Sequence, residues 1–329
     1  MEKKIYSFPD HILEALKANN IFSFNNVSFS SVVISGQGGS AIGGFLILDL
    51  LDLRKIKIPI LVNQGYELPA WANNNTLLIV SSYSGNTEET INILNQGIQN
   101  KCQIVCLCSG GKILDIAKKN NLDYLLLPSG FQPRAALGYS IVQLFKILDH
   151  KKIKSSDFNF KLNEDSFKKV AYFLKDNQNE IIQRAQSLAE KINNKITVVY
   201  SSSNFFASAL RFKQQLNENS KSHCWFNVIP EMNHNEIVGW SEKYDNIFSL
   251  FINSSFDSKS NQKRISLTIN HVQKYSDIEL LHPKGEDLFR QIFYLIHLFD
   301  FTSFFLAKKK GVNPSKIEAI DKLKLGLNK

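Results

Sequence analysis

Four hydroxyl side chains crowd one short segment, Ser81-Ser82-Tyr83-Ser84-Gly85-Asn86-Thr87. It follows the apolar run Leu77–Val80 and precedes a helical pattern that begins near Glu88. A strand-to-helix turn gathers backbone N–H groups at the positive end of a helix dipole, and hydroxyls add further donors. This arrangement favours a phosphate ligand. The simpler interpretation is a Ser/Thr-rich helix cap, which would use only one or two of the hydroxyls.

A second turn that could receive an anion is Gly36-Gln37-Gly38-Gly39-Ser40, directly after an expected strand. Its glycine spacing loosely matches a dinucleotide fingerprint. However, the next expected strand ends in Asn63-Gln64-Gly65, without the acidic residue that binds ribose hydroxyls. We therefore disfavour a nicotinamide cofactor. Both turns follow strands at the sheet edge where open parallel sheets bind ligands.

The remaining candidate residues could move protons or stabilise charge. Glu218 ends a helical segment, and His234 follows an expected strand. A carboxylate and an imidazole can transfer protons on carbon and oxygen. Either residue could instead be an ordinary exposed side chain, and His223 is the nearest alternative to His234. Arg134, at a helix start, is either a surface salt-bridge residue or a fixed cation over a developing oxyanion.

These residues need an α/β scaffold to hold them. Strands are expected at residues 31–35, 58–63, 76–82, 103–107, 124–127, 196–200, 225–229 and 247–251. Continuous apolar strands that alternate with helical patterns predict parallel sheets covered on both faces. A strand, a Ser-rich turn and a helix occur in the same order in both halves, which indicates an internal repeat.

The length of 329 residues suits about two domains. We expect an N-terminal phosphate-binding domain over residues 1–152 and a C-terminal domain over residues 193–329. Between them, residues 153–192 are expected to form a polar linker and one long helix from Glu164 to Lys191.

Composition excludes several classes of protein. The hydrophobic content of 43% and charged content of 21% indicate a globular chain. The net charge of +9 comes from scattered lysines without interleaved aromatics, so no nucleic-acid partner is expected. The apolar run over residues 292–307 contains His297 and Asp300 and is too short to span a membrane.

The cysteines and the N-terminus bear on location. Cys102, Cys106, Cys108 and Cys224 lack the spacing of a zinc site, and we expect reduced core thiols and no metal. Residues 1–5 lack the apolar core of a signal peptide. A cytoplasmic protein is therefore expected.

Taken together, these segments resemble sugar isomerase (SIS) domain proteins, and more narrowly the bifunctional phosphoglucose/phosphomannose isomerase family. The resemblance covers nearly the whole chain and is carried by Gly36–Gly44, Ser81–Glu89, Pro133-Arg134, Leu216–Asn219, Asn233–Glu236, Gly311–Pro314 and Ile320–Lys324. It implies two SIS-type domains, each a doubly wound, flavodoxin-like parallel sheet flanked by helices. The hydroxyl turn alone would leave regulators and amidotransferase domains open.

The resemblance implies isomerisation of glucose 6-phosphate, and of mannose 6-phosphate, to fructose 6-phosphate through a cis-enediolate, without a cofactor. Glu218 would be the base, His234 and Lys322 would assist ring opening, and Arg134 would stabilise the enediolate. The residues implied to bind substrate are Gly39, Ser40, Ser82, Ser84, Thr87 and Ser315. The family's active site is shared across a homodimer, with the histidine supplied by the partner subunit.

One departure from the family pattern, one ambiguous assignment and one alternative function stay open. Ser315 stands where the family usually has Thr, so activity on both C2 epimers is less secure than isomerase activity. Lys324 competes with Lys322 for the role of the tail lysine. The alternative function is a non-catalytic SIS regulator that senses sugar phosphates, which would need the phosphate turn but not a Glu, His and Lys set.

Overall fold

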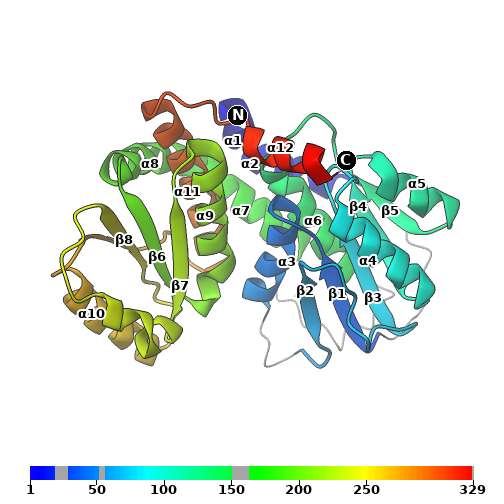
Figure 1. Cartoon of the computed structure of the whole chain (residues 1–329), viewed down its shortest axis with the longest axis horizontal. Coiled ribbons are helices and arrows are strands. Elements are labelled where there is room, and N and C mark those ends of the chain that lie inside the picture. Colours follow the sequence, from blue (N-terminus) through cyan, green and yellow to red (C-terminus); the bar gives the residue numbers. More distant parts are fainter. Residues whose placement is uncertain (19–28, 52–55, 150–162, 328–329) are drawn as a thin grey trace. The chain divides into compact units, whose positions relative to one another are not determined.

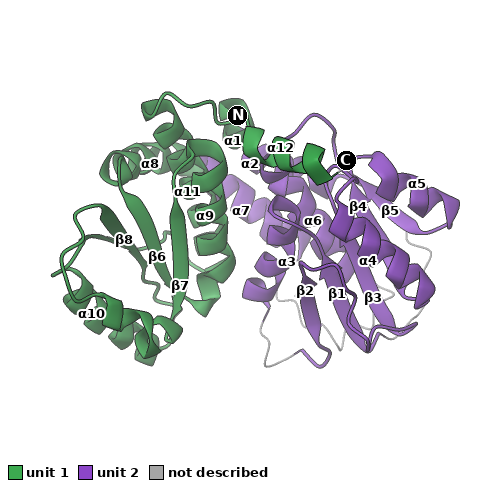
Figure 2. Ribbon diagram, viewed as in Figure 1, with its two compact units in different colours: residues 1–6, 176–329 green, residues 7–175 purple. Residues whose placement is uncertain are grey.

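Two separate parallel sheets organise the chain. The computed structural model describes residues 1–18, 29–51, 56–149 and 163–327 (Figure 1). The chain divides into two compact units (Figure 2): unit 1 comprises residues 1–6 and 176–329, and unit 2 comprises residues 7–175. The division falls inside the expected segment 153–192. The polar linker expected near residues 151–160 lies outside the described residues.

Unit 2 contains a five-stranded sheet in the order β2-β1-β3-β4-β5, with every neighbouring pair parallel. Its strands are β1 (Ser31–Ser35), β2 (Ile60–Asn63), β3 (Thr76–Ser81), β4 (Gln103–Cys108) and β5 (Asp123–Leu126). All residues of β1 and β3 are buried, as strands covered on both faces require. This is the flavodoxin-like order, in which the winding of the chain reverses between β1 and β3. The predicted fold class is confirmed.

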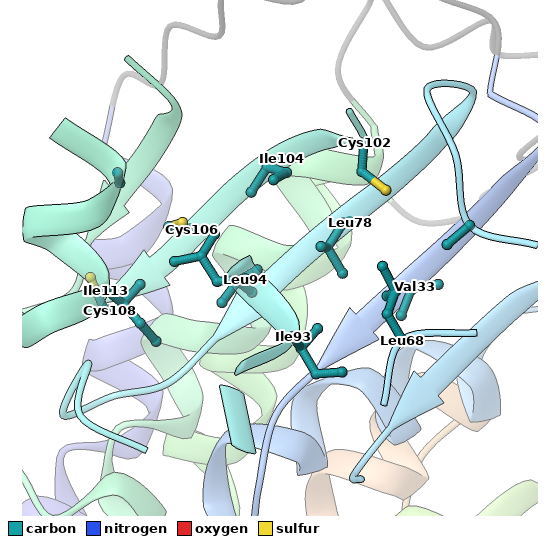
Figure 3. Packing of buried hydrophobic residues seen from close by; sticks show 13 residues of the cluster. Val33, Leu68, Leu78, Ile93, Leu94, Cys102, Ile104, Cys106, Cys108 and Ile113 are labelled. Atoms are coloured by element: carbon teal, nitrogen blue, oxygen red, sulfur yellow. The ribbon is translucent and has the colours of Figure 1, made fainter. Parts of the chain in front are cut away.

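Helices cover both faces of this sheet. They are α2 (Phe8–Leu16), α3 (Gly39–Leu50), α4 (Glu88–Gln99), α5 (Gly111–Lys119), the 3-10 turn η1 (Pro133–Ala135), α6 (Leu137–Leu148) and α7 (Glu164–Asp176). On the face covered by α4 and α5, Leu78 and Cys106 pack in one cluster with Ile93 and Leu94 (Figure 3). On the other face, Gly44 of α3 lets the helix approach β1 and β2 closely.

Unit 1 contains a four-stranded parallel sheet in the order β7-β6-β8-β9. Its strands are β6 (Ile196–Ser202), β7 (Cys224–Ile229), β8 (Ile247–Ile252) and β9 (Asp277–Leu281). Taken in chain order, these strands repeat the arrangement of β1 to β4, which confirms the expected internal repeat. Strand β9 was not expected, because an edge strand that begins Asp-Ile-Glu lacks the continuous apolar run of the others.

The helical elements of unit 1 are α1 (Glu2–Tyr6), α8 (Gln178–Ile192), η2 (Ser203–Phe205), α9 (Phe206–Ser220), η3 (Glu231–His234), η4 (Glu236–Gly239), α10 (Lys259–Val272), α11 (Leu288–Lys309) and α12 (Glu318–Leu327). Helix α11 packs against α8, α9 and α1, whereas α10 covers the other face of the sheet. The single long helix expected from Glu164 to Lys191 is wrong: it breaks into α7 and α8 at Asn177. Asp176 and Asn177 favour helix ends over helix interiors, which accounts for the break.

Helix α11 contains the apolar run over residues 292–307 and is buried along most of its length. Its Asp300 accepts hydrogen bonds from Arg211 Nε (3.0 Å), Arg211 Nη2 (2.7 Å) and Gln215 Nε2 (2.7 Å), so the buried carboxylate is paired with α9. The predicted buried helix is confirmed. None of the helices within the described ranges has the length and apolar character needed to cross a membrane.

Candidate functional site

The hydroxyl turn joins β3 to α4 in unit 2. Thr87 is the N-cap residue of α4, but its side chain caps no helix amide. Its Oγ1 lies 2.9 Å from Ser82 Oγ instead. The helix-cap interpretation of these hydroxyls is therefore wrong for Thr87. Ser82 is only 1% exposed, whereas Ser84 is exposed, so Ser84 and Thr87 can touch a ligand while Ser82 orients Thr87.

The turn is shaped by close contact with the loop after β4. Gly85 has a φ of +66°, and a Cβ placed there would lie 1.8 Å from the carbonyl oxygen of Gly110. Only glycine fits this position. Ser109 N donates to Tyr83 O (2.8 Å), and Ile113 N donates to Gly85 O (2.9 Å). The turn is therefore held by the loop after β4 and by the start of α5.

The two turns expected to receive an anion meet. Tyr83 N donates to Ser40 Oγ (3.1 Å), and Ser81 Oγ donates to Ser40 O (3.2 Å). Ser40 opens α3 after β1, so both turns lie at the carboxyl ends of β1 and β3. This is the point where the winding reverses and where sheets of this order bind ligands.

Arg134 lies on η1 and is 3% exposed, so its interpretation as a surface salt-bridge residue is wrong. A Cβ on Gly39 would lie 2.9 Å from Arg134 N. Gly39 therefore lets the first turn pack against the backbone of Arg134, a reason that the sequence did not indicate. The structure brings Arg134 next to the first of the two turns.

Tyr83 fixes the loop that leads to Arg134. Its hydroxyl donates to Pro128 O (2.7 Å) and accepts from Phe131 N (2.8 Å). Tyr83 thus connects the hydroxyl turn, Ser40 and the approach to η1. Sequence reasoning missed this role, because its partners lie more than forty residues away in the chain.

In unit 1, Glu218 lies in the last turn of α9 and is half-buried. Helix α9 ends at Lys221, whose backbone is left-handed (φ +51°). Lys221 Nζ donates to Glu218 O (2.7 Å), Asn313 O (2.7 Å) and Lys316 O (2.9 Å). The structure therefore ties the end of α9 to the segment that contains Ser315. No sequence signal singled out Lys221.

His234 ends η3, after β7, and is exposed. Its neighbours are anchored: Asn233 Nδ2 donates to Thr268 Oγ1 (2.8 Å), and Glu236 accepts from Tyr200 Oη and Asn227 Nδ2, each at 2.6 Å. Glu236 thus holds the turn in place, and the turn presents His234 to the surface.

Ser315 and the tail lysines lie at the C-terminal part of unit 1. Ser315 is half-buried, and its backbone N–H donates to Asn313 Oδ1 (2.8 Å). Lys322 and Lys324 both lie on α12, which has no buried residue, so the geometry does not separate them. Within the described part of the chain, no group of three or more His, Cys, Asp or Glu side chains could hold a metal ion.

Residues 181–327 match the family described as the bacterial phospho-glucose isomerase C-terminal SIS domain. A bifunctional phosphoglucose/phosphomannose isomerase from Caldicellulosiruptor bescii is 36% identical, over 98% of each chain. One of the same description from Aquifex aeolicus is 31% identical over 92% of this chain and 91% of its own. In fold, the chain is similar to the tagatose-6-phosphate ketose/aldose isomerase of Escherichia coli, with a TM-score of 0.71, 13% identity and coverage of 95% and 93%.

Proposed function

Because the chain belongs to the family of bifunctional phosphoglucose/phosphomannose isomerases, we propose that it interconverts glucose 6-phosphate and mannose 6-phosphate with fructose 6-phosphate. It is an isomerase, an intramolecular oxidoreductase that acts on a sugar phosphate. The observation that carries the proposal is the joined pair of turns at the ends of β1 and β3, beside the buried Arg134.

The phosphate group would be held by donors rather than by charge alone. Ser40, Ser84 and Thr87 supply hydroxyls, and the start of α4 supplies backbone N–H groups and its dipole. Binding energy from this remote group can hold the reacting carbons in place during catalysis. The phosphate therefore acts as the anchor and takes no part in bond making.

The chemical step removes a proton from the carbon next to a carbonyl. We assign Glu218 as the base, and general base catalysis is worth about 10²–10⁴-fold. The cis-enediolate carries charge on oxygen, for which Arg134 is a fixed cation worth about 3 kcal/mol. His234 and Lys322 would open the sugar ring, and Ser315 would leave room for either C2 epimer.

We further propose a homodimer in which His234 serves the site of the partner subunit. The support is that the turn is rigidly anchored while the imidazole itself is exposed. Sedimentation of the purified protein tests the oligomer. Mixing His234→Ala with Glu218→Gln subunits tests the sharing, because mixed dimers would regain one intact site.

A cytoplasmic location is part of the same proposal. Cys102, Cys106, Cys108 and Cys224 are free and buried, and burial raises the pKa of the Cys106 thiol to about 12. Reduced core thiols of this kind suit a reducing compartment.

The decisive experiment is a coupled assay of glucose 6-phosphate formation from fructose 6-phosphate, with a parallel assay for mannose 6-phosphate. The proposal expects turnover in both assays and loss of turnover in Glu218→Gln. Tight binding of fructose 6-phosphate by the wild-type protein without turnover would instead support the regulator. Turnover in the first assay alone would show that the protein isomerises glucose 6-phosphate but not mannose 6-phosphate.

A further inference from the structure

Unit 1 repeats the winding reversal of unit 2, and with it the pair of loops that meet there. In unit 2, residues 82–87 lie between β3 and α4; in unit 1, residues 253–258 lie between β8 and α10 (Figure 1). The two turns have the same length. The registers also agree, because Ser35 pairs with Val80 and Tyr200 pairs with Phe251, each one residue before the end of β3 or β8.

The turn of unit 1 contains a buried carboxylate. Asp257, only 5% exposed, occupies the position that Asn86 has in unit 2. The Asn86 side chain faces the start of α5, where its Oδ1 accepts from Lys112 N (3.1 Å). The Asp257 carboxylate instead points into its own unit, toward the end of β6.

Three donors converge on the Asp257 carboxylate. Ser202 Oγ donates to its Oδ1, Asn204 Nδ2 donates to the same oxygen (3.2 Å), and Ser254 N donates to Oδ2 (3.3 Å). Ser202 ends β6 and Asn204 follows it, and by register they correspond to Gln37 and Gly39 of the first turn of unit 2. Donors from both loops of the repeat therefore meet on one anion.

Helix capping does not explain this carboxylate. Ser258 is the N-cap residue of α10, and its side chain accepts from Asn261 N (3.2 Å). Burial raises the pKa of Asp257, and the three hydrogen bonds oppose this by stabilising the charged form.

Two more polar groups lie beside this turn, at the ends of β6 and β8. Ser201 Oγ and Asn253 Oδ1 are buried and have no hydrogen-bond partner among the described residues. Buried polar groups without a partner are uncommon in folded proteins. The carboxyl edge of this sheet thus carries more polar groups than the fold itself uses.

We infer that Asp257 is a built-in anion in the turn of unit 1 that corresponds to the phosphate turn of unit 2. Unit 1 then binds no phosphate at this turn, and each chain has one phosphate site. Replacing the carboxylate by a smaller side chain would open a second anion site. The inference depends on the proposed function only for the identity of the ligand in unit 2.

Two substitutions distinguish the effect of the Asp257 charge from the effect of the volume of its side chain. Asp257→Ala removes the charge and opens room for an anion, whereas Asp257→Asn removes the charge but keeps the bulk. In sodium chloride, both should lower the melting temperature by about 5 °C, because Asp257→Ala leaves buried donors without an acceptor and Asp257→Asn replaces one accepting oxygen by a donor. Sodium formate at equal ionic strength should restore most of this loss in Asp257→Ala, and little of it in Asp257→Asn or the wild-type protein. Equal effects of formate on all three proteins would overturn the inference.

Equilibrium dialysis with radiolabelled inorganic phosphate provides the second measurement. Asp257→Ala should bind one more phosphate per chain than the wild-type protein. The difference in bound phosphate between Asp257→Ala and the wild-type protein tests the inference about Asp257. The number of phosphates bound by the wild-type protein tests the proposed site in unit 2, so the two proposals can fail independently. An unchanged count together with no formate effect contradicts the inference. If Asp257→Ala does not fold in chloride, refolding yields are compared in formate and chloride, for this variant and for Asp257→Ser; equal yields contradict it as well.

Discussion

The ring of Tyr83 reaches from the hydroxyl turn to the loop before Arg134. Its backbone N–H contacts Ser40, and its hydroxyl contacts Pro128 and Phe131. The residue therefore couples the proposed phosphate turn to the proposed cation. Because this hydroxyl is engaged with two backbone groups, we expect it to act on the reaction only by positioning other residues.

Removing that hydroxyl should affect turnover more than binding. We expect Tyr83→Phe to lower kcat about tenfold, since the loss of two hydrogen bonds of about 1 kcal/mol each lets Arg134 shift. The KM for fructose 6-phosphate should change less than twofold. Steady-state kinetics beside Tyr124→Phe, a substitution at an exposed tyrosine of β5, provide the measurement. A rise in KM with kcat unchanged would make Tyr83 a part of the phosphate site only.

Glu218→Gln should keep the shape of the side chain and lose the base. The expected loss in kcat is about 10²–10⁴-fold, with the Kd for fructose 6-phosphate retained. Calorimetric binding and the coupled assay measure the two quantities, and Glu286→Gln, a change at an exposed carboxylate, is the matched control. More than about a tenth of the wild-type activity would rule out Glu218 as the base.

Arg134→Lys keeps a positive charge but loses the planar fork of donors. If Arg134 stabilises the enediolate, kcat should fall by roughly 10²-fold while KM stays within a few fold. The same coupled assay measures this. A change confined to KM would instead identify Arg134 as a clamp on the bound sugar phosphate.

The sequence indicates candidate residues best where the candidates lie close together in the chain. The hydroxyls of residues 81–87 can be recognised as a group in the sequence because they are close together in the chain. Tyr83, Lys221 and Asp257 could not be predicted, because their partners come from loops far away in sequence. The role of Gly39 was missed for the same reason, since the backbone that it approaches belongs to Arg134.

At the level of elements, α9 and α11 are joined by a polar seam inside an apolar interface. Arg211, Gln215 and Asn219 recur every fourth residue on α9 and face Asp300 and Ser303 of α11. Beside this seam, the rings of Phe212 and Phe299 stack at 4.1 Å. The seam fixes the rotation of α9 about its axis and so the direction in which Glu218 points.

Breaking this seam should be costly. Asp300→Ala leaves the buried Arg211 without its carboxylate and should lower the free energy of unfolding by about 3–5 kcal/mol. Urea denaturation measures the loss. The matched control is Asp277→Ala on β9. It removes an exposed carboxylate that pairs with Lys195, and it should cost less than about 1 kcal/mol. Similar losses in both variants would mean that the buried pair of Arg211 and Asp300 stabilises the fold no more than an exposed ion pair does.

The elements themselves were predictable where burial makes the pattern simple. Every strand buried on both faces was found from its apolar run, as was the buried helix α11. The edge strand β9 was not, since one polar side is exposed and pairs with Lys191 and Lys195. The break at Asn177 was missed, because the helical periodicity continues across it.

Over the whole molecule, the net charge of +9 favours anionic ligands in the surrounding solution. We expect kcat/KM for fructose 6-phosphate to fall roughly threefold to tenfold between about 50 and 500 mM potassium chloride, as screening weakens long-range attraction. Potassium acetate at equal ionic strength should give the same curve. A flat curve would show that capture of the substrate is independent of the net charge, and different curves would indicate anion binding at the site.

Alternation of strands and helices predicted that both sheets are parallel, but it could not indicate which distant segments share a unit. Residues 1–6 belong with residues 176–329, because α1 packs on α11 and the rings of Tyr6 and Phe301 lie 5.2 Å apart. A contact across almost the whole length of the chain leaves no trace in local patterns.

That contact has a consequence for how the protein is made. On the ribosome, all residues of unit 2 have been synthesised once Lys175 is added, so unit 2 can fold before unit 1 is complete. At about 5–20 residues per second, synthesis of residues 176–329 then takes roughly 8–30 s more. During this interval α1 lacks α11, the helix against which Tyr6 packs. The core of unit 1 can form only after α11 has been synthesised. Nascent chains that stall before residue 288 should therefore carry a folded unit 2 attached to an open unit 1, which is the form that a chaperone would meet.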